Sequence, residues 1–213
     1  MTKQKAQIAI IDYGFGNIKS VANAIIFLGA KPCIIDEPSK LSNFCAAILP
    51  GVGAFGPAID FLKSKGFDEH IKDFINNGKM LYGICLGFQL LFTKSYEHGE
   101  FEGLNLLKGE VKKFEKSFDL RVPHIGWNNI ELSKNSDSLK MFSGISDNEY
   151  FYFVHSYYVL PQKCEVYSSS CKYGVDFCSS AAFKNIWGSQ FHPEKSGKKG
   201  LKILSNFIEE SLK

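Results

Sequence analysis

The N-terminal half of the chain alternates uninterrupted apolar runs with segments of helical periodicity. The apolar runs span residues 6–12, 45–50 and 80–84. The segments between them, 17–29 and 57–77, space their apolar side chains as amphipathic helices do. Strands that are apolar at every position are buried on both faces, which is typical of a parallel sheet covered by helices. The alternation therefore predicts an α/β fold with a mostly parallel central sheet flanked by helices.

The second half of the chain is richer in β-strand signals, and a final helix is expected over residues 197–212. The strand-like segments read GEVKKF, GWNNIEL, EYFYFVHSYYVL, CEVYSSSC and NIWGSQF. The chain has 213 residues, of which 45% are hydrophobic, enough for one sizeable core. Because no repeat, low-complexity segment or linker-like shift in composition interrupts it, we expect a single domain over residues 1–213.

Charge and hydropathy exclude several classes of protein. The net charge is only +3 without a basic block, so no nucleic-acid footprint is indicated. No stretch approaches the roughly 20 apolar residues of a membrane span. Residues 1–7 are polar and do not predict a secretory signal. We therefore expect a cytoplasmic protein with no membrane partner.

The six cysteines predict no metal site. In a reducing compartment they are expected to be free thiols. Cys164, Cys171 and Cys178 are regularly spaced, but no C-x-x-C pair and no nearby histidine completes a zinc ligand set. We expect these three to be buried or half-buried thiols of strands.

One cysteine stands in a different pattern, Gly83-Ile84-Cys85-Leu86-Gly87, between an apolar strand and a helix-like run. This is the form of a nucleophile elbow with sulfur in place of the serine oxygen. A sharp strand-to-helix turn holds the nucleophile at the edge of the sheet, and only small flanking residues let the backbone pass. The N–H of Leu86 is then placed to bind a developing oxyanion.

A thiolate nucleophile needs a base, and the base needs an orienting group. Among the five histidines, His192 follows a buried-looking strand in the segment FHPEKSG. Glu194 lies two residues further, on the same side of an extended chain, so its carboxylate can reach the imidazole. The other histidines are expected to be solvated (His70, His98) or to be structural or line a pocket (His124, His155).

Two glycine-rich loops invite a nucleotide-binding interpretation. Gly51, Gly53 and Gly56 match G-x-G-x-x-G, but prolines bracket this loop and it follows the third strand rather than the first. The earlier loop, Gly14-Phe15-Gly16, has a lysine where the third glycine belongs. A second oxyanion donor is the better interpretation of the Gly51–Gly53 loop.

These residues resemble the class I (triad) glutamine amidotransferases. Within that class, further segments are similar to the glutaminase subunits of imidazole glycerol phosphate synthase, from about residue 7 to the C-terminus. They read IDYGFGN (11–17), LPGVGAFGPA (49–58), PHIGWN (123–128), YFVHSYY (152–158) and QFHPEKSGKKG (190–200). The resemblance implies a flavodoxin-like amidotransferase fold.

The resemblance also implies roles for individual residues. It implies a catalytic triad of Cys85, His192 and Glu194. It implies an oxyanion hole at Leu86, Val52 and Gly53, and a glutamine pocket bordered by Gly51, Gln89, Glu97, Ser156 and Tyr157. It implies a surface that meets a synthase partner at Tyr13, Asn17, Trp127 and Lys195.

The implied activity is hydrolysis of L-glutamine to glutamate and ammonia through a Cys85 thioester. The resemblance further implies a cyclase partner that receives the ammonia, and no metal or organic cofactor. We expect the Gly51–Gly53 loop to be incompletely formed without that partner.

Other interpretations remain open at this point. A paralogous glutaminase that supplies a nucleotide-sugar amidating synthetase would share the triad, because function is set by sites and partners more than by fold. An inactive scaffold is disfavoured by the intact triad residues, and a thiol hydrolase acting on peptides is disfavoured by the matches at Gln89 and HSYY.

Overall fold

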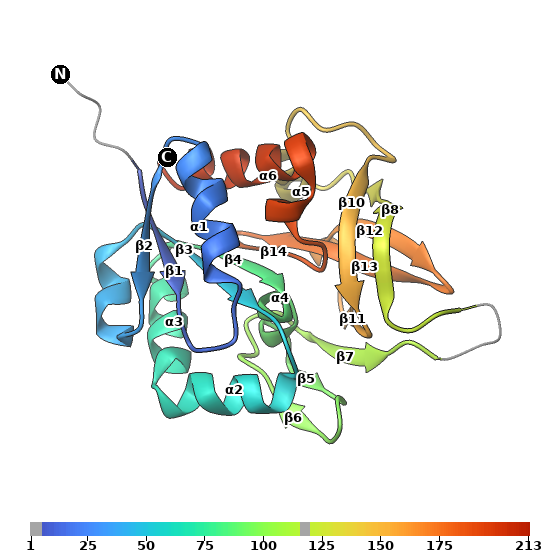
Figure 1. Ribbon diagram of the computed structural model, residues 1–213, viewed down its shortest axis with the longest axis horizontal. Coiled ribbons are helices and arrows are strands. Elements are labelled where there is room, and N and C mark those ends of the chain that lie inside the picture. The colour runs from blue at the N-terminus through green and yellow to red at the C-terminus, as the bar shows by residue number, and fades with distance from the viewer. Residues whose placement is uncertain (1–5, 116–119) are drawn as a thin grey trace.

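The computed structural model, which describes residues 6–115 and 120–213, contains a long mixed sheet with helices on both sides (Figure 1). Its parallel part has the strand order β2–β1–β3–β4–β14. In that order the strands span Lys31–Ile35, Gln7–Ile11, Ala46–Gly51, Met80–Cys85 and Ile186–Ser189. The mostly parallel sheet expected from the sequence is confirmed. Because β3, β4 and β14 run in the same direction, the residues that follow them gather at one edge of the sheet.

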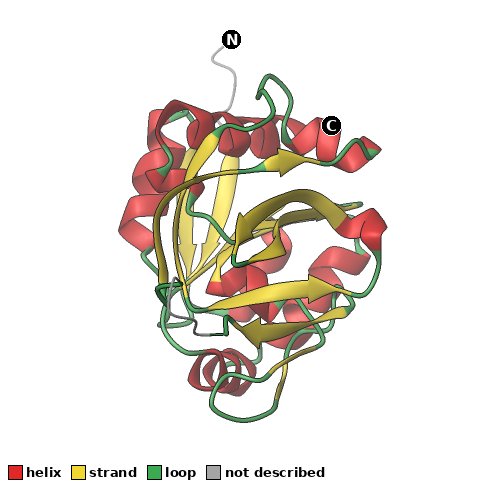
Figure 2. Ribbon diagram, turned by 90° about the vertical axis from the view of Figure 1, so that its right-hand side faces the viewer, coloured by secondary structure: helices red, strands yellow, loops and turns green. Residues whose placement is uncertain are grey.

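The second half of the chain extends this sheet with mainly antiparallel strands. Beyond β14 come β13 (Val175–Phe183), β11 (Tyr157–Pro161), β7 (Gly109–Lys113), β5 (Lys94–Ser95) and β6 (Phe101–Glu102). Two strands pair to one side, β12 (Tyr167–Tyr173) and β9 (Glu131–Leu132), and a separate antiparallel ribbon consists of β8 (His124–Asn129) and β10 (Tyr150–His155). Figure 2 shows this strand-rich side of the molecule facing the viewer. The β-rich second half is therefore confirmed as well.

Helices cover both faces of the sheet. One face carries α1 (Ile18–Phe27), α5 (Ser136–Met141) and α6 (Gly197–Glu210), and the other carries α2 (Phe55–Ser64), α3 (Phe67–Asn76) and α4 (Leu86–Leu90). Short 3-10 turns lie at Pro38–Asn43, Cys164–Val166 and Pro193–Lys195. Along β1, Ile10 packs into the core on the α1 face and Ile11 into the core on the α2 face, as the alternation of a strand requires.

Two helix starts show how side chains set the boundaries. The Asn17 side chain accepts a hydrogen bond from the Ser20 N–H (3.3 Å), which caps α1 where the sequence predicts. Helix α2 begins at Phe55, two residues before the predicted start, because the Glu97 carboxylate accepts the Phe55 N–H (2.7 Å) from a distant loop. The predicted helical segment 57–77 is divided at Gly66, whose φ of +78° separates α2 from α3.

The predicted strand thiols are correct for Cys171 and Cys178, which are buried in β12 and β13. The prediction is wrong for Cys164, which is exposed because it lies in a 3-10 turn before β12 begins. Among residues 6–115 and 120–213, no cluster of His, Cys, Asp and Glu side chains is arranged to hold a metal ion. In the same ranges, no helix is both long and apolar enough to cross a membrane.

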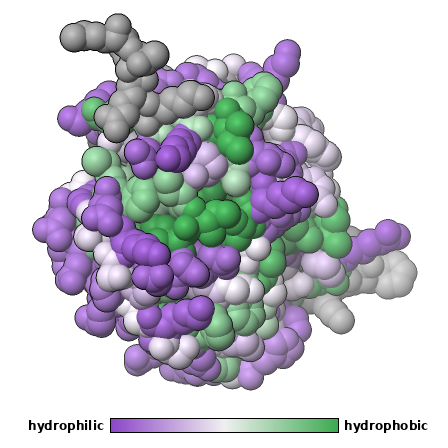
Figure 3. Space-filling model, turned by 60° about the vertical axis from the view of Figure 1, so that its left-hand side comes forward, coloured by the Kyte–Doolittle hydropathy of each residue, from purple (hydrophilic) through white to green (hydrophobic). Residues whose placement is uncertain are grey.

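One side of the molecule carries apolar side chains that face solvent. Strand β2 is the edge of the parallel part of the sheet, and its Ile34 is exposed. Ile26 and Phe27, at the end of α1, are exposed too. Figure 3 shows an apolar patch on this side, bordered by hydrophilic side chains.

Candidate active site

Cys85 occupies a sharp turn between strand β4 and helix α4. Its backbone has φ 55° and ψ −109°, a combination that non-glycine residues rarely adopt. The turn depends on two glycines: a Cβ on Gly87 would clash with the Leu49 carbonyl, and one on Gly83 would lie 2.8 Å from the Gly87 carbonyl oxygen. The predicted elbow is therefore present, because only glycine allows the backbones of β3, β4 and α4 to approach this closely.

His192 and Glu194 follow β14, the strand next to β4, and their side chains are almost fully buried. The His192 Nδ1 lies 2.9 Å from the Glu194 Oε1. The backbone of His192 is anchored on both sides: its N–H donates to the Tyr152 carbonyl (3.0 Å), and its carbonyl accepts from the Ser196 hydroxyl (2.6 Å). With Nδ1 donating to the carboxylate, the Nε2 remains for Cys85.

The protonation of His192 depends on its two neighbours. Burial by itself lowers the pKa of His192, but the interactions with Cys85 and then with Glu194 outweigh it and raise this pKa to about 10. The imidazole therefore holds a proton at neutral pH. Its Nε2 has no other hydrogen-bond partner among the described residues. A protonated imidazole can stabilise a neighbouring thiolate, which is the reactive form of a nucleophilic cysteine.

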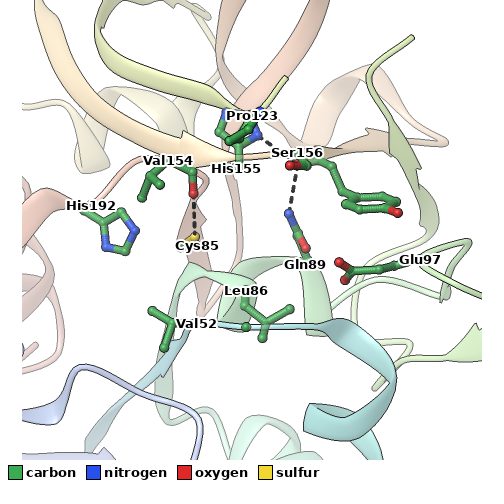
Figure 4. A pocket seen from close by; sticks show the side chains of 12 residues that line it. Val52, Cys85, Leu86, Gln89, Glu97, Pro123, Val154, His155, Ser156 and His192 are labelled. Carbon is green, nitrogen blue, oxygen red and sulfur yellow. Dashed lines mark hydrogen bonds between the residues drawn. The ribbon is translucent and has the colours of Figure 1, made fainter. Parts of the chain in front are cut away.

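Cys85 and His192 line one end of a cavity of about 340 Å³ (Figure 4). Nine of the residues singled out from the sequence line it, namely Val52, Gly53, Cys85, Leu86, Gln89, Glu97, Ser156, Tyr157 and His192. Pro123, Val154 and His155 complete the wall. The volume is within the range of small-ligand pockets, so a free amino acid fits the space.

Two glutamines link the nucleophile to the far side of the pocket. The Gln89 Nε2 donates to the Tyr157 carbonyl (3.0 Å) and to the Gln190 Oε1 (2.9 Å). The Gln190 Nε2 in turn donates to the Cys85 sulfur (3.7 Å). Gln190 is not among the site residues predicted from the sequence. The available signal was a polar residue inside the buried segment NIWGSQF, two residues before His192.

Glu97 reaches the pocket from the loop after β5. One of its carboxylate oxygens is held by the Phe55 N–H, and its own N–H donates to the Ser95 hydroxyl (3.2 Å). In Figure 4 the carboxylate points across the pocket toward Gln89. This places a fixed negative charge at the end of the cavity opposite His192, where an ammonium group of a ligand would be stabilised.

Two buried histidines are linked beside the pocket: His155 lines it, and His124 lies behind His155. The Asn128 amide donates to the His124 Nε2 (3.3 Å), the His124 Nδ1 lies 3.0 Å from the His155 Nε2, and the His155 Nδ1 lies 2.8 Å from the Tyr157 carbonyl. Burial lowers the pKa of His124 to about 4 and that of His155 to about 3. Both rings are therefore neutral at pH 7, and each can donate one N–H along this chain.

The loop after β3 does not present the Val52 N–H to Cys85, in line with the expectation that this loop is incompletely formed without the partner. The Val52 N–H, an expected oxyanion donor, donates to the Phe15 carbonyl (2.7 Å), so it is not available to a ligand at Cys85. Gly53 follows with φ +99°, a value that favours glycine. Gly51 lies in the last position of β3, opposite Cys85, and does not line the cavity. Leu86 and Gly53, the other two residues expected at the oxyanion hole, line the cavity together with Cys85.

The four residues expected at a partner surface fall into two groups. Trp127 is 56% exposed, and Asn17 and Lys195 are exposed too. Tyr13 is fully buried, so its prediction as a surface residue is wrong. The reason is local: Tyr13 follows the buried strand β1, and its ring packs inward beneath the Gly51–Gly53 loop.

Comparison with known proteins agrees with this geometry. The profile of the family described as "Glutamine amidotransferase class-I" matches residues 9–211. The chain therefore belongs to the class-I glutamine amidotransferase family, which confirms the family and fold expected from the sequence.

Curated relatives match 95% of the chain. The imidazole glycerol phosphate synthase subunit HisH of Caldanaerobacter subterraneus subsp. tengcongensis is 46% identical, covering 95% of this chain and 97% of its own. The HisH subunit of Chlorobaculum tepidum is 42% identical, with coverage of 95% and 99%. That of Sulfurimonas denitrificans is 46% identical, with coverage of 95% and 97%.

Solved structures match the fold at low identity. A structure of PurLQS from Thermotoga maritima aligns with a TM-score of 0.77 at 19% identity, over 99% of this chain and 100% of that one. A putative GMP synthase protein from Thermoplasma acidophilum aligns with a TM-score of 0.69 at 19% identity, over 98% and 95% of the two chains. At such identity these likenesses concern the fold alone.

Proposed function

We propose that the chain is the glutaminase subunit of an imidazole glycerol phosphate synthase: it hydrolyses L-glutamine and passes the ammonia to a cyclase subunit for histidine biosynthesis. The observation that carries the chemistry is that Cys85 and His192 line one end of the cavity, while the Glu194 carboxylate lies 2.9 Å from the His192 Nδ1. The full-length relatives named as HisH support the choice of synthase. They do not favour the paralogous glutaminase that would feed a sugar-amidating synthetase.

In the proposed reaction, the Cys85 thiolate attacks the side-chain amide carbon of glutamine. The electrons of the C=O bond move to oxygen, and backbone N–H groups beside the elbow stabilise the oxyanion. His192 donates its proton to the amide nitrogen, the C–N bond breaks, and ammonia leaves. A glutamyl thioester then remains on the sulfur.

The second half of the reaction regenerates the enzyme. His192, now neutral, accepts a proton from water, and the resulting hydroxide attacks the thioester carbon. The C–S bond breaks, glutamate departs, and the thiolate and imidazolium are restored. Glu194 holds the imidazole in the required tautomer and stabilises its charged form.

The substrate is bound along the length of the cavity. Glu97 supplies the charge for the α-ammonium group, and Ser156 and Tyr157 border the path between it and Cys85. Gln89 braces this wall, because its amide is already committed to the Tyr157 carbonyl and to Gln190. A longer or uncharged amide would lose the contact with Glu97 or would not place its carbonyl at the sulfur.

The occupied Val52 N–H supports control by the partner. In the isolated chain one oxyanion donor is bonded to the Phe15 carbonyl, so glutamine hydrolysis is slow. Docking of the cyclase subunit at the exposed Trp127, Asn17 and Lys195 favours the loop conformation in which this N–H turns toward Cys85. Such coupling prevents the loss of ammonia when no acceptor is present.

The test is glutamate release from glutamine by the purified chain, alone and with the cyclase subunit and its ribonucleotide substrate. We expect slow release alone and an increase of about 10²- to 10³-fold in the complex, the range associated with one oxyanion donor. The Cys85→Ala variant should release none in either state. If glutamate release does not increase with the cyclase although Cys85 still reacts with a glutamine-like electrophile, the assignment as a glutaminase would stand, and the cyclase would be rejected as its partner.

A further inference from the structure

Tyr13 carries a buried polar group that the mechanism above does not use. Its side chain is fully buried, and its hydroxyl has no hydrogen-bond partner among the described residues. Buried hydroxyl groups in native proteins are nearly always paired, so an unpaired one requires an explanation. A phenylalanine would fill the same space without this cost.

The position of the hydroxyl provides a clue. A Cβ built on Gly51 would lie 2.7 Å from the Tyr13 hydroxyl oxygen and 2.5 Å from the Gly87 nitrogen. The hydroxyl therefore lies against the backbone of Gly51, directly beneath the turn that carries Cys85. The Tyr13 ring also stacks on Phe15 (5.9 Å between ring centroids), the residue whose carbonyl holds the Val52 N–H.

The Gly51–Val52 peptide links these observations. A trans peptide directs its N–H and its C=O in opposite directions. When the Val52 N–H turns from the Phe15 carbonyl toward Cys85, the Gly51 C=O swings to the side that the N–H has left. There it would face the Phe15 carbonyl, acceptor against acceptor, unless a donor is available. The Tyr13 hydroxyl is a donor beside Gly51 that has no partner among the described residues.

We propose that Tyr13 is a positioning residue: in the active loop conformation its hydroxyl donates a hydrogen bond to the Gly51 carbonyl. This hydrogen bond replaces the one between Val52 and Phe15, and so lowers the free energy of the turned loop conformation. The inference rests on the proposed glutaminase function and adds a residue within the chain that stabilises the active state.

The electrostatic surroundings suit a donor. Burial, and then the charge of Cys85, raise the pKa of Tyr13 far above the ordinary value of a phenol. The hydroxyl therefore keeps its proton at every pH at which the enzyme works. It does not touch the substrate, so its effect must be transmitted through the loop.

The test is the Tyr13→Phe variant, assayed as the isolated chain and in the complex with the cyclase subunit. We expect the partner-stimulated kcat to fall about fivefold to tenfold, the equivalent of one hydrogen bond. The KM for glutamine and the rate at which iodoacetamide alkylates Cys85 should not change. Thermal stability of the isolated chain should stay the same or rise, because the hydroxyl is unpaired there.

Tyr82→Phe is the matched control. Tyr82 is also fully buried, but its hydroxyl donates to Ser189 (3.1 Å) and its ring packs on Phe207. This variant should lose stability and retain the stimulation by the partner.

Two results would overturn the role of Tyr13. One is a Tyr13→Phe variant with the full wild-type stimulation; the other is a loss of kcat accompanied by equal losses of alkylation rate and stability, which indicates a structural role. In both cases the wild-type chain would still be stimulated. If the wild-type chain itself shows no stimulation, the proposed function fails, and the role of Tyr13 fails with it.

Discussion

The nucleophile turn and the loop after β3 lie side by side, yet they are held in place very differently. Cys85 is locked by backbone contacts that tolerate no side chain at Gly83 or Gly87. The adjacent loop is held by one hydrogen bond from Val52 to Phe15, Val52 is 42% exposed, and the site of a Cβ on Gly53 is almost open. In the proposed reaction the first region supplies the nucleophile and the second supplies an oxyanion donor.

The contrast shows how a glutaminase can have its nucleophile in place and still be inactive. The side chains of Cys85, His192 and Glu194 are held by the core, so in the proposed mechanism they need no rearrangement when a partner binds. The Val52 N–H, the second oxyanion donor, lies in the more loosely held of the two regions. Control is thus placed on transition-state stabilisation, which affects rate strongly, and not on the nucleophile.

Removal of the nucleophile should produce the largest effect. Cys85→Ala is expected to lower partner-stimulated glutamate release by about 10⁴-fold or more, because no thioester can form. The fold should be unchanged, as circular dichroism can verify. Cys33→Ala, a cysteine outside the pocket, serves as the control and should keep full activity. Substantial turnover by Cys85→Ala would exclude covalent catalysis at this site.

The next effect concerns the orienting carboxylate. Glu194→Gln should lower kcat by about 10²- to 10⁴-fold, since the amide neither fixes the tautomer nor stabilises the imidazolium. The carboxylate raises the pKa of His192, so its loss should lower that pKa from about 10. The alkaline limb of the kcat/KM profile should therefore move to lower pH. Glu69→Gln, on the exposed face of α3, is the control, and an unmoved limb would contradict the assignment.

A pair of glycine variants compares the two regions directly. Gly87→Ala should destabilise the protein by about 3 kcal/mol or more, because the new Cβ meets the backbone of Leu49. Gly53→Ala should cost only about 1–2 kcal/mol, since its φ of +99° is strained for alanine but the space is open. Urea denaturation measures both. Equal losses of stability would remove the distinction between a locked turn and a loosely held loop.

The smallest effect concerns the buried pair His124 and His155, which, like the Cys85 turn, is held by the core. His155 has a pKa of about 3 in the folded state, below its ordinary value of 6.5, so the unfolded chain binds the extra proton first as the pH falls. Its contribution to stability is complete above pH 6.5 and decreases toward pH 3. From pH 6.5 to 5 we expect a loss of about 2 kcal/mol.

Thermal denaturation at pH 7 and pH 5 measures this loss. His155→Gln should reduce the difference between the two pH values, and His70→Gln, a change on the exposed surface of α3, should leave it as in the wild type. An unchanged difference in His155→Gln would show that other groups determine the acid sensitivity.

Much of the fold and of the chemistry could be predicted from local patterns. The apolar runs identify the parallel strands, and the elbow glycines flank Cys85 because the turn is a local feature. His192 and Glu194 are two residues apart, so their contact was also predictable. The features that were missed depend on partners distant in the sequence. Gln190, which follows the strand next to β4, contacts Cys85, and Glu97 determines where α2 begins.

The errors have the same origin. The resemblance implied that Tyr13 lies at a partner surface, but the strand before it directs its ring into the core. The carbonyl that accepts the Val52 N–H comes from Phe15, in a different loop, so this particular bond could not be predicted. Neither the spacing nor the composition of the sequence indicates whether the Gly51–Val52 peptide directs its N–H toward Phe15 or toward Cys85.

The central claim is that the nucleophile Cys85 is preformed and that the Val52 N–H, its oxyanion donor, is not yet in position. The most direct test measures two rates on the same samples, with and without the cyclase subunit and its ribonucleotide: alkylation of Cys85 by iodoacetamide and glutamate release from glutamine. Alkylation requires the thiolate but no oxyanion donor. We predict that the partner leaves the alkylation rate unchanged and raises glutamate release about 10²- to 10³-fold. A parallel rise of both rates would show that the partner activates the nucleophile itself, and would contradict this account.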